Sequence, residues 1–256
     1  METQPKRLSN RQFERYCTLV YNECGIHLSE EKRALLNARI AKRLRFLDVS
    51  ADQYLDIILG DADEKGRFID AVSTNHTYFF RESRSFAYVS EHCRDIWCAA
   101  SSSGEEPYSL AAHCLKNGYD AAILATDISD TCLQKGNAGI YPDQCIKNIP
   151  EDILKSCFQK GLNRWAGFVR IKPPVKRMVS FKKFNLLKDR LPDTLFDMIF
   201  CRNVMIYFDR ATKEHVVARL ASVLKPGGHF IIGGAESLNG LAHGLKYIEP
   251  SVYRKP

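Results

Sequence analysis

Apolar residues recur every three or four positions through the first part of the chain, which is the spacing of amphipathic helices. The first such run follows a cap within residues 8–10 and stops before Gly25, and the second opens at Ser29. Two further helices are expected at residues 51–59 and 63–72. These runs predict an all-α region. The apolar positions of the first two helices are Phe13, Tyr16, Leu19, Val20, Leu36, Ile40, Leu44 and Leu47.

After a further helix expected at residues 82–92, the pattern changes to short apolar runs that alternate with helices. Such alternation predicts an α/β fold built on a parallel sheet. Residues 140–182 interrupt it, and two short runs there, 168–171 and 178–181, are expected to pair in a small antiparallel sheet. The remaining expected strands and helices are at residues 96–99, 105–117, 121–127, 196–200, 210–224 and 229–232.

The composition suits a globular protein of the cytoplasm. Hydrophobic residues make up 45% and charged residues 26% of 256 positions, enough to bury a sizeable core. The nine cysteines are odd in number and contain no C-x-x-C, so we expect reduced thiols and no metal site. The first ten residues lack the apolar segment of a secretory signal, and no apolar run approaches the roughly 20 residues that span a bilayer.

The net charge of +7 favours acidic partners, which include nucleic acid, an anionic membrane and an acidic protein surface. The second predicted helix concentrates this charge opposite its apolar stripe. An ordinary solvated surface and a docking face for an acidic helix or polyanion are both compatible with it. The basic residues concerned are Arg33, Arg39, Lys42, Arg43 and Arg45.

The stretch from Ile96 to Leu110 runs from a predicted strand through a serine-rich turn into a helix that opens with Glu105 and Glu106. A strand, a tight turn and a helix N-terminus leave backbone N–H groups facing one cavity, which suits a cofactor. Gly104 is the one glycine of this turn, whereas the dinucleotide fingerprint has three, so an ordinary connection is an open alternative.

Asp127 ends the next predicted strand, 23 positions after Gly104. A carboxylate about 20 residues beyond such a turn accepts hydrogen bonds from ribose hydroxyls. The same residue could instead cap the helix that follows. Downstream, polar residues follow the strand at 196–200, at the carboxyl end where open α/β sheets bind ligands; they are Arg202, Asn203 and Tyr207.

Three consecutive aromatic residues, 78–80, lie between the helical region and the α/β region. They could be a stacking platform for nucleic acid or a buried seam, and we favour the seam because buried aromatic residues are commonplace. Asn75, Thr77 and Arg81 bracket them with the few oriented polar groups that a ligand pocket needs.

Taken in order, these segments resemble the CheR family of chemoreceptor glutamate methyltransferases. The matching pieces are TNHTYFFR (74–81), GEEPYS (104–109), ATDIS (125–129), NLL (185–187), FDMIFCRNVMIYFD (196–209), LKPGGHF (224–230), ESL (236–238) and Tyr253. Three departures are a short stretch between Arg81 and Trp97, the serine-rich turn at 101–103, and the missing histidine before Glu236-Ser237.

The resemblance implies a helical receptor-docking domain at residues 1–72 and an S-adenosylmethionine-dependent, Rossmann-like domain at 73–256, with an inserted β-subdomain within 140–182. It implies that Arg81 and Tyr207 act at the methyl-transfer centre. The residues that it places at the cofactor are Asn75, Thr77, Arg81, Glu105 or Glu106, Asp127, Asn185, Leu186, Arg202 and Asn203.

The implied reaction agrees with the residues. A glutamate of pKa near 4.3 is already ionised at neutral pH, so its methylation needs alignment and dryness rather than a general base. An arginine can orient the acceptor carboxylate and a tyrosine can fix the geometry. The implied partners are acidic helical segments of chemoreceptor cytoplasmic domains, bound by a monomer. Some family members also grip a receptor tail with the inserted sheet, for which residues 161–176 around Trp165 are the candidate surface. An ordinary structural role for Trp165 is an equally open alternative.

Two other functions stay open at this point. A nucleic-acid methyltransferase would suit the positive charge. Amino-methylating enzymes of that kind carry an Asn/Asp-Pro-Pro-aromatic tetrad after strand four, where this chain has Arg202-Asn203-Val204-Met205. A signalling module that binds the cofactor without turnover is the other alternative.

Overall fold

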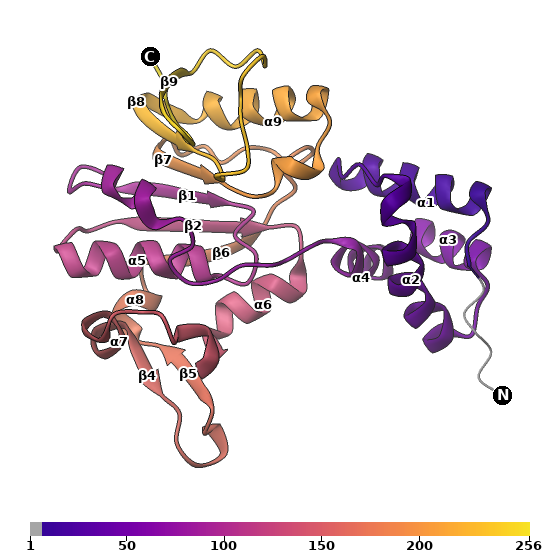
Figure 1. Cartoon of the computed structure of the whole chain (residues 1–256), viewed down its shortest axis with the longest axis horizontal. Coiled ribbons are helices and arrows are strands. Elements are labelled where there is room, and N and C mark those ends of the chain that lie inside the picture. The colour runs from indigo at the N-terminus through magenta and orange to yellow at the C-terminus, as the bar shows by residue number, and fades with distance from the viewer. Residues whose placement is uncertain (1–6) are drawn as a thin grey trace. The chain divides into compact units, whose positions relative to one another are not determined.

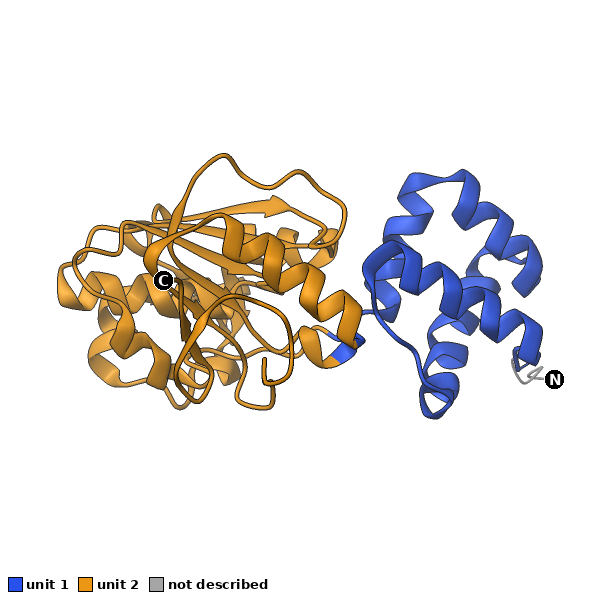
Figure 2. Ribbon diagram, turned by 90° about the horizontal axis from the view of Figure 1, so that it is seen from above, with its two compact units in different colours: residues 1–74, 207–209 blue, residues 75–206, 210–256 orange. Residues whose placement is uncertain are grey.

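The computed structural model describes residues 7–256, so part of the stretch from which we expect no secretory signal lies outside the described residues. The chain forms two compact units (Figure 2). One comprises residues up to 74 together with Tyr207–Asp209, and the other comprises residues 75–206 and 210–256. Of the helices that the structure describes, none has both the length and the apolar character needed to cross a membrane.

The first unit is a helical bundle, as the apolar spacing predicts (Figure 1). Three buried aromatic rings, those of Tyr16, Tyr54 and Phe68, lie together with centroids between 5.6 and 6.4 Å apart. Such ring pairs add to the stabilisation that burial alone provides. The helices are α1 (Asn10–Cys24), α2 (Arg33–Leu47), α3 (Ala51–Gly60) and α4 (Ala62–Val72).

The second helix begins later than predicted. A 3₁₀ turn, η1 (Glu30–Lys32), follows Ser29, and the α-helix starts only at Arg33. Ser9 at the start of α1 forms a full capping box with Gln12. Ser29 cannot do the same, because the residue three positions later is Lys32, which has no oxygen to accept the returning hydrogen bond.

The basic face predicted on α2 is partly wrong. The Arg43 guanidinium forms an ion pair with Glu64, which is 3% exposed and also accepts from the Tyr54 hydroxyl at 2.8 Å. Arg39 donates to the carbonyl oxygens of Val72 and Ser73. A buried carboxylate must be paired to be tolerated, so these arginines hold α2 against α4.

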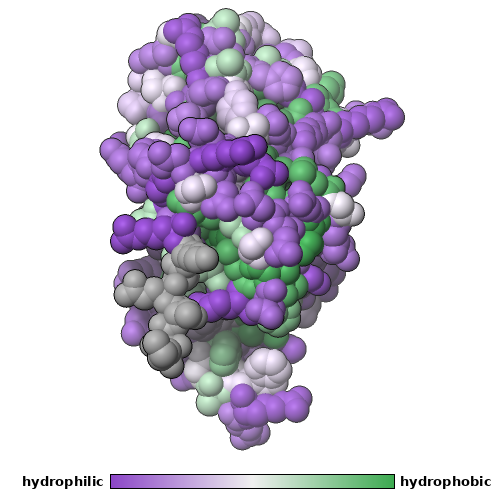
Figure 3. Space-filling model, turned by 90° about the vertical axis from the view of Figure 1, so that its right-hand side faces the viewer, coloured by the Kyte–Doolittle hydropathy of each residue, from purple (hydrophilic) through white to green (hydrophobic). Residues whose placement is uncertain are grey.

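Other cations of α2 remain on the surface. Lys42 and Arg45 are exposed, and so are two apolar residues of the same helix, Leu35 at 44% and Phe46 at 74%. The face of the molecule drawn in Figure 3 shows a hydrophobic patch bordered by hydrophilic side chains. The exposed side of α2 is therefore mixed in character rather than uniformly basic.

The second unit contains a seven-stranded sheet in the order β6-β2-β1-β7-β8-β10-β9. The first five of these strands are parallel, and β10 pairs antiparallel with both β8 and β9. The predicted α/β class is confirmed. The strands are β1 (Asp95–Ala99), β2 (Ala122–Asp127), β6 (Val179–Lys183), β7 (Phe196–Cys201), β8 (Leu224–Ile231), β9 (Lys246–Glu249) and β10 (Val252–Arg254).

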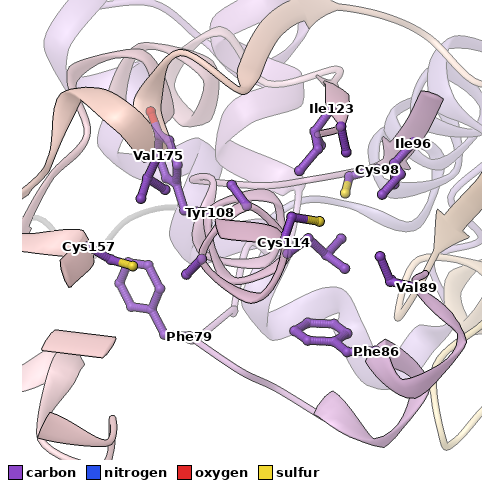
Figure 4. Close-up of a cluster of buried hydrophobic side chains, with 14 of the residues drawn as sticks. Phe79, Phe86, Val89, Ile96, Cys98, Tyr108, Cys114, Ile123, Cys157 and Val175 are labelled. Carbon is purple, nitrogen blue, oxygen red and sulfur yellow. The ribbon is translucent and has the colours of Figure 1, made fainter. Parts of the chain in front are cut away.

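Strand β1 is buried on both faces, which explains its continuous apolar sequence. Trp97 packs against the rings of Phe184 and Phe196 and donates its indole N–H to Thr126 Oγ1 at 2.9 Å. Ile96 and Cys98 alternate with it and join the cluster drawn in Figure 4, where they meet side chains of α5 (Glu105–Asn117) and of residues 79–89. The other helices of this unit are α6 (Asp130–Ala138), α7 (Glu151–Cys157), α8 (Pro173–Lys176) and α9 (Arg210–Ser222).

A separate three-stranded antiparallel sheet lies between α6 and β6 in the sequence, as predicted for the insertion. It consists of β3 (Ile140–Pro142), β4 (Phe158–Lys160) and β5 (Phe168–Ile171), with β5 in the centre. The N–H of Ile171 donates to the carbonyl oxygen of Gly139 at 2.8 Å, which brings the two ends of the insertion together.

Two predicted elements of this unit are wrong. The run at 178–181 does not join the small sheet, because strand β6 pairs in parallel with β2 at the edge of the large sheet. The helix expected at 82–92 is only a 3₁₀ helix, η2 (Ser83–Tyr88). Glu82 has a left-handed backbone with φ of 47°, and Val89 is extended and buried, so both ends stop an α-helix.

Candidate active site

The carboxyl ends of β2, β1, β7 and β8 meet at one edge of the large sheet. The register pairs Ala99 with Thr126 on one side and with Cys201 on the other, and Phe200 with Ile231. The turn after β1, Asp127 and the residues after β7 and β8 therefore emerge next to one another. This is the edge at which parallel α/β sheets bind ligands.

The turn between β1 and α5 takes an unusual backbone path. Ala100, Ser102 and Gly104 all have positive φ, at 67°, 50° and 95°. A Cβ at Gly104 would lie 2.9 Å from the Phe181 ring and 3.1 Å from Gly136 Cα, so this position requires glycine. Helix α5 starts here without a capping side chain, which leaves the first N–H groups of the helix to face a ligand.

Asp127 ties the end of β2 to this turn. Its carboxylate accepts from the N–H of Ser102 at 2.7 Å and from the N–H of Ser129 at 2.9 Å, and the residue is 7% exposed. Ser129, not Asp127, is the N-cap of α6, because its hydroxyl accepts from Cys132 N–H at 3.1 Å. The helix-cap alternative for Asp127 is therefore wrong.

The two glutamates that open α5 have different surroundings. Glu105 accepts from the Ser103 hydroxyl at 2.7 Å, and burial raises the pKa of its carboxyl. Burial also raises the pKa of Glu106, and the Arg202 guanidinium opposes that rise across an ion pair of 2.6 Å. Of the two glutamates, Glu106 is thus the one that contacts the segment after β7.

Arg202 is a buried arginine whose side chain is 2% exposed. Besides Glu106, it donates to the Arg81 carbonyl oxygen at 2.8 Å and to Glu82 Oε2 at 3.0 Å. Although burial acts to lower the pKa of Arg202, its two carboxylate partners hold it above the ordinary value. Among the described residues, its Nε atom is buried and has no hydrogen-bond partner.

The segment before η2 supplies the polar residues predicted around the aromatic run. Arg81 donates to the His76 carbonyl oxygen at 3.1 Å, and its Nε lies 3.6 Å from Glu82 Oε1. Asn75 is exposed and accepts at its carbonyl oxygen from the Ser102 hydroxyl at 3.2 Å, and Thr77 is half-buried.

The aromatic residues of this segment are mainly structural. Phe79 is buried and packs edge-on against the rings of Tyr141 and Phe158, with centroids 5.0 and 5.2 Å away. A ring held in this way cannot stack on a nucleic-acid base. The interpretation of residues 78–80 as a nucleic-acid stacking platform therefore loses its central member.

Asn185 and Leu186 lie just beyond β6 at the same sheet edge. The N–H of Phe184 donates to the Asp127 carbonyl oxygen at 3.0 Å, which sets the segment beside Asp127. The Asn185 side chain accepts from Leu187 N–H at 3.0 Å, and Leu186 is buried. Asn203, directly after Arg202, has a left-handed backbone with φ of 58°.

Tyr207 groups with the helical unit rather than with the other predicted site residues. Its carbonyl oxygen accepts from His27 N–H at 2.9 Å, and the Lys32 ammonium lies 4.8 Å from its ring centroid. Within the same unit, the Tyr21 hydroxyl donates to Asp209 at 2.8 Å.

Two carboxylates at this edge were not predicted from the sequence. Glu82 accepts from Gly234 N–H at 2.8 Å as well as from Arg202, and these donors hold its pKa below the ordinary value despite burial. Glu236 accepts from the N–H groups of Asn203 and Gly233. Glu236 belongs to the ESL block that carries the family resemblance, and Glu82 directly follows the TNHTYFFR block; these positions were the available signal.

Both units match known protein families. The family model for the CheR methyltransferase all-alpha domain matches residues 11–73, and that for the CheR methyltransferase SAM binding domain matches residues 75–253. The chain is 36% identical to the chemotaxis protein methyltransferase of Salmonella typhimurium, over 98% of this chain and 92% of that protein. The corresponding proteins of Borreliella burgdorferi and Escherichia coli are 35% and 34% identical, over 97% and 98% of this chain and 95% and 93% of theirs.

Proposed function

The chain belongs to the CheR methyltransferase family, and on that premise we propose that it methylates glutamate side chains of bacterial chemoreceptors. The methyl donor is S-adenosylmethionine, and the products are a glutamate methyl ester and S-adenosylhomocysteine. The observation that carries this proposal is the convergence of the β1–α5 turn, Asp127 and the buried Arg202 at one sheet edge.

The residues at this edge fit the donor's functional groups. Asp127 offers a carboxylate to ribose hydroxyls, as the acid beyond such a turn does in dinucleotide sites. Asn185 and Leu186, held beside Asp127, suit the adenine side. The uncapped start of α5 and the unpartnered Arg202 Nε suit the methionine end, where an anionic carboxylate needs donors.

Of the two glutamates on α5, we assign the cofactor contact to Glu106. Glu106 pairs with Arg202, which we place at the methionine end, whereas the Glu105 carboxylate accepts from the hydroxyl of Ser103 in the turn before its own helix. Asn203 follows Arg202 directly in the sequence, and Asn75 contacts the β1–α5 turn through its carbonyl oxygen. Asn203, Asn75 and its near neighbour Thr77 are proposed to complete the cofactor site.

The chemistry asks little of the protein beyond alignment. The cofactor supplies a methyl group on a positively charged sulfur, which an oxygen nucleophile can displace in line. The acceptor glutamate is already a carboxylate at neutral pH, so the chain has no proton to remove, and the rate should vary little between about pH 6 and pH 8.

Arg81 is proposed to orient that acceptor carboxylate. A guanidinium has five N–H groups, so one that donates to the His76 carbonyl oxygen and faces Glu82 can still bind a second carboxylate. Tyr207 is proposed to fix the geometry around the transferred methyl group. Holding the reacting atoms in position can supply up to roughly 7–11 kcal/mol of the barrier reduction.

The proposed partner is an acidic helical segment of a receptor's cytoplasmic domain. We propose that this chain binds it in the cytoplasm as a monomer. The exposed side of α2 suits such a helix, because Lys42 and Arg45 can pair with its carboxylates while Leu35 and Phe46 cover apolar area. The tip of the small sheet, where Trp165 is 47% exposed, is the candidate surface for a receptor tail.

Transfer of a radiolabelled methyl group to receptor-rich membranes tests the function directly. The label should appear on the receptor and be released by mild alkali, because a carboxyl methyl ester is base-labile. Label that resists alkali would point to a methylated amine and overturn the glutamate assignment. Membranes from cells without chemoreceptors are the matched control and should stay unlabelled.

A further inference from the structure

A single carboxylate joins the segments that follow β7 and β8. Glu236 Oε2 accepts from the N–H groups of Gly233 at 2.7 Å and Asn203 at 2.8 Å, and Oε1 accepts from Ile206 N–H at 3.2 Å. The N–H of Glu236 itself donates to the Gly233 carbonyl oxygen at 2.9 Å. Hydrogen bonds from amides to an ionised carboxylate are stronger than those between neutral groups.

The backbone that this carboxylate holds has an uncommon conformation. Asn203 has φ of 58°, a conformation that costs free energy for a residue with a side chain. Gly233 packs so closely that a Cβ there would lie 2.5 Å from Asn203 Nδ2 and 2.9 Å from Asn203 N. The Glu236 carboxylate therefore fixes Asn203 against the turn that follows β8.

The turn after β8 is also tied to the segment that carries Arg81. Gly234 N–H donates to Glu82 Oε2 at 2.8 Å, and the same oxygen accepts from Arg202 Nη2 at 3.0 Å. The residues around Arg81, Arg202 and Asn203 are thus connected through one short turn, residues 233–236. A displacement of this turn would move both the segment around Arg81 and the segment that follows β7.

We infer that Glu236 is a positioning residue for methyl transfer: its carboxylate holds Asn203–Ile206 in the conformation that binds the cofactor. Glu236 acts through the backbone amides that it accepts from and touches no reacting atom. This inference rests on the proposed function, because Asn203 is assigned there to the cofactor.

Titration calorimetry with S-adenosylhomocysteine tests the inference. Glu236→Gln keeps the size of the side chain but loses the charge and sets an NH₂ group against one of the three donors. The Kd of Glu236→Gln for S-adenosylhomocysteine should rise about tenfold, because the substitution removes one charge-assisted hydrogen bond. Gly233→Ala places a Cβ 2.5 Å from Asn203 Nδ2 and 2.9 Å from Glu236 Oε2, so it should disturb the same contact and weaken binding similarly. The control, Glu91→Gln, removes one charge at an exposed position and should bind like the parent.

A double-mutant cycle separates positioning from general stabilisation. If Glu236 acts through Asn203, then Asn203→Ala should raise the Kd at least threefold less in the Glu236→Gln background than in the parent. Equal effects in both backgrounds, or parental affinity in both Glu236→Gln and Gly233→Ala, would overturn the inference. A parent chain that binds no S-adenosylhomocysteine would instead contradict the proposed function itself.

Discussion

Replacing Asp127 by Asn is the sharpest test of the cofactor assignment. The parent carboxylate uses both oxygens toward the protein, one for Ser102 N–H at 2.7 Å and one for Ser129 N–H at 2.9 Å. The asparagine oxygen can accept a hydrogen bond from one of these N–H groups, but the asparagine NH₂ group then faces the other N–H group. The substitution therefore removes the charge and leaves one N–H group of the turn without an acceptor.

The expected effect on binding follows from the charge. A hydrogen bond from a ribose hydroxyl to a carboxylate contributes about 1.5–3 kcal/mol, so its loss should raise the Kd for S-adenosylhomocysteine roughly 10- to 150-fold. The unsatisfied N–H group should cost a further ~1–3 kcal/mol in folding stability. At saturating cofactor, kcat should change little, because Asp127 is not assigned to the reacting atoms.

Calorimetry and thermal melting on the same samples separate these two effects. Asp130→Asn is the matched control: it removes the same charge three residues away, at a half-exposed position whose partner is Lys183. Its Kd should equal that of the parent. A Kd for Asp127→Asn within threefold of the parent, in a protein that is folded at the temperature of the measurement, would refute the ribose assignment.

Three other perturbations test the arginines and lysines. Arg43→Met should lower the free energy of unfolding by about 3 kcal/mol in urea titrations, because it removes the main ion-pair partner of the buried Glu64. This is the low end of the range for a broken buried ion pair, since the Tyr54 hydroxyl and Arg67 still face the carboxylate. The Arg43 guanidinium holds the pKa of Glu64 below its ordinary value. The loss of unfolding free energy in Arg43→Met should therefore be full above about pH 4.3 and become smaller as the pH falls through the lowered pKa. A loss that stays the same in acid would contradict the pairing. Arg81→Ala should lower kcat at least about 100-fold, and a normal kcat would exclude its orienting role. Lys42→Glu with Arg45→Glu should weaken receptor binding and its salt dependence but leave turnover on a short peptide unchanged, and equal losses on both substrates would refute docking.

Local patterns predicted the elements whose formation depends on their own sequence. The helices of the first unit follow from apolar spacing, and the βα turn with Asp127 follows from the order of apolar runs and small residues. The strand at 178–181 was assigned to the wrong sheet because pairing depends on a distant partner, here β2. Its apolar run fits either sheet equally well.

Charge patterns were less informative than apolar ones. Arg39, Arg43 and Lys42 look alike in the sequence, yet Arg39 and Arg43 bind groups of α4 and its end, whereas Lys42 is exposed. Whether an arginine of α2 is buried depends on the position of its partners on α4, such as Glu64, and the spacing of residues along α2 contains no information about that position. For the same reason, the three amides that converge on Glu236 could not be foreseen, since they come from separate turns.

The way the small sheet is inserted has a consequence for divergence between relatives. Its two ends meet through the hydrogen bond from Ile171 to Gly139, and β6 then returns to the large sheet beside β2. With the ends pinned, lengthening the loops between them costs only a slowly growing closure entropy. Differences in length between relatives are therefore expected in the loops of the insertion, such as the turn around Trp165. The rings of Tyr141 and Phe158 should stay in place, because they pack on Phe79 and the Tyr141 hydroxyl donates to the Ser103 carbonyl oxygen in the β1–α5 turn.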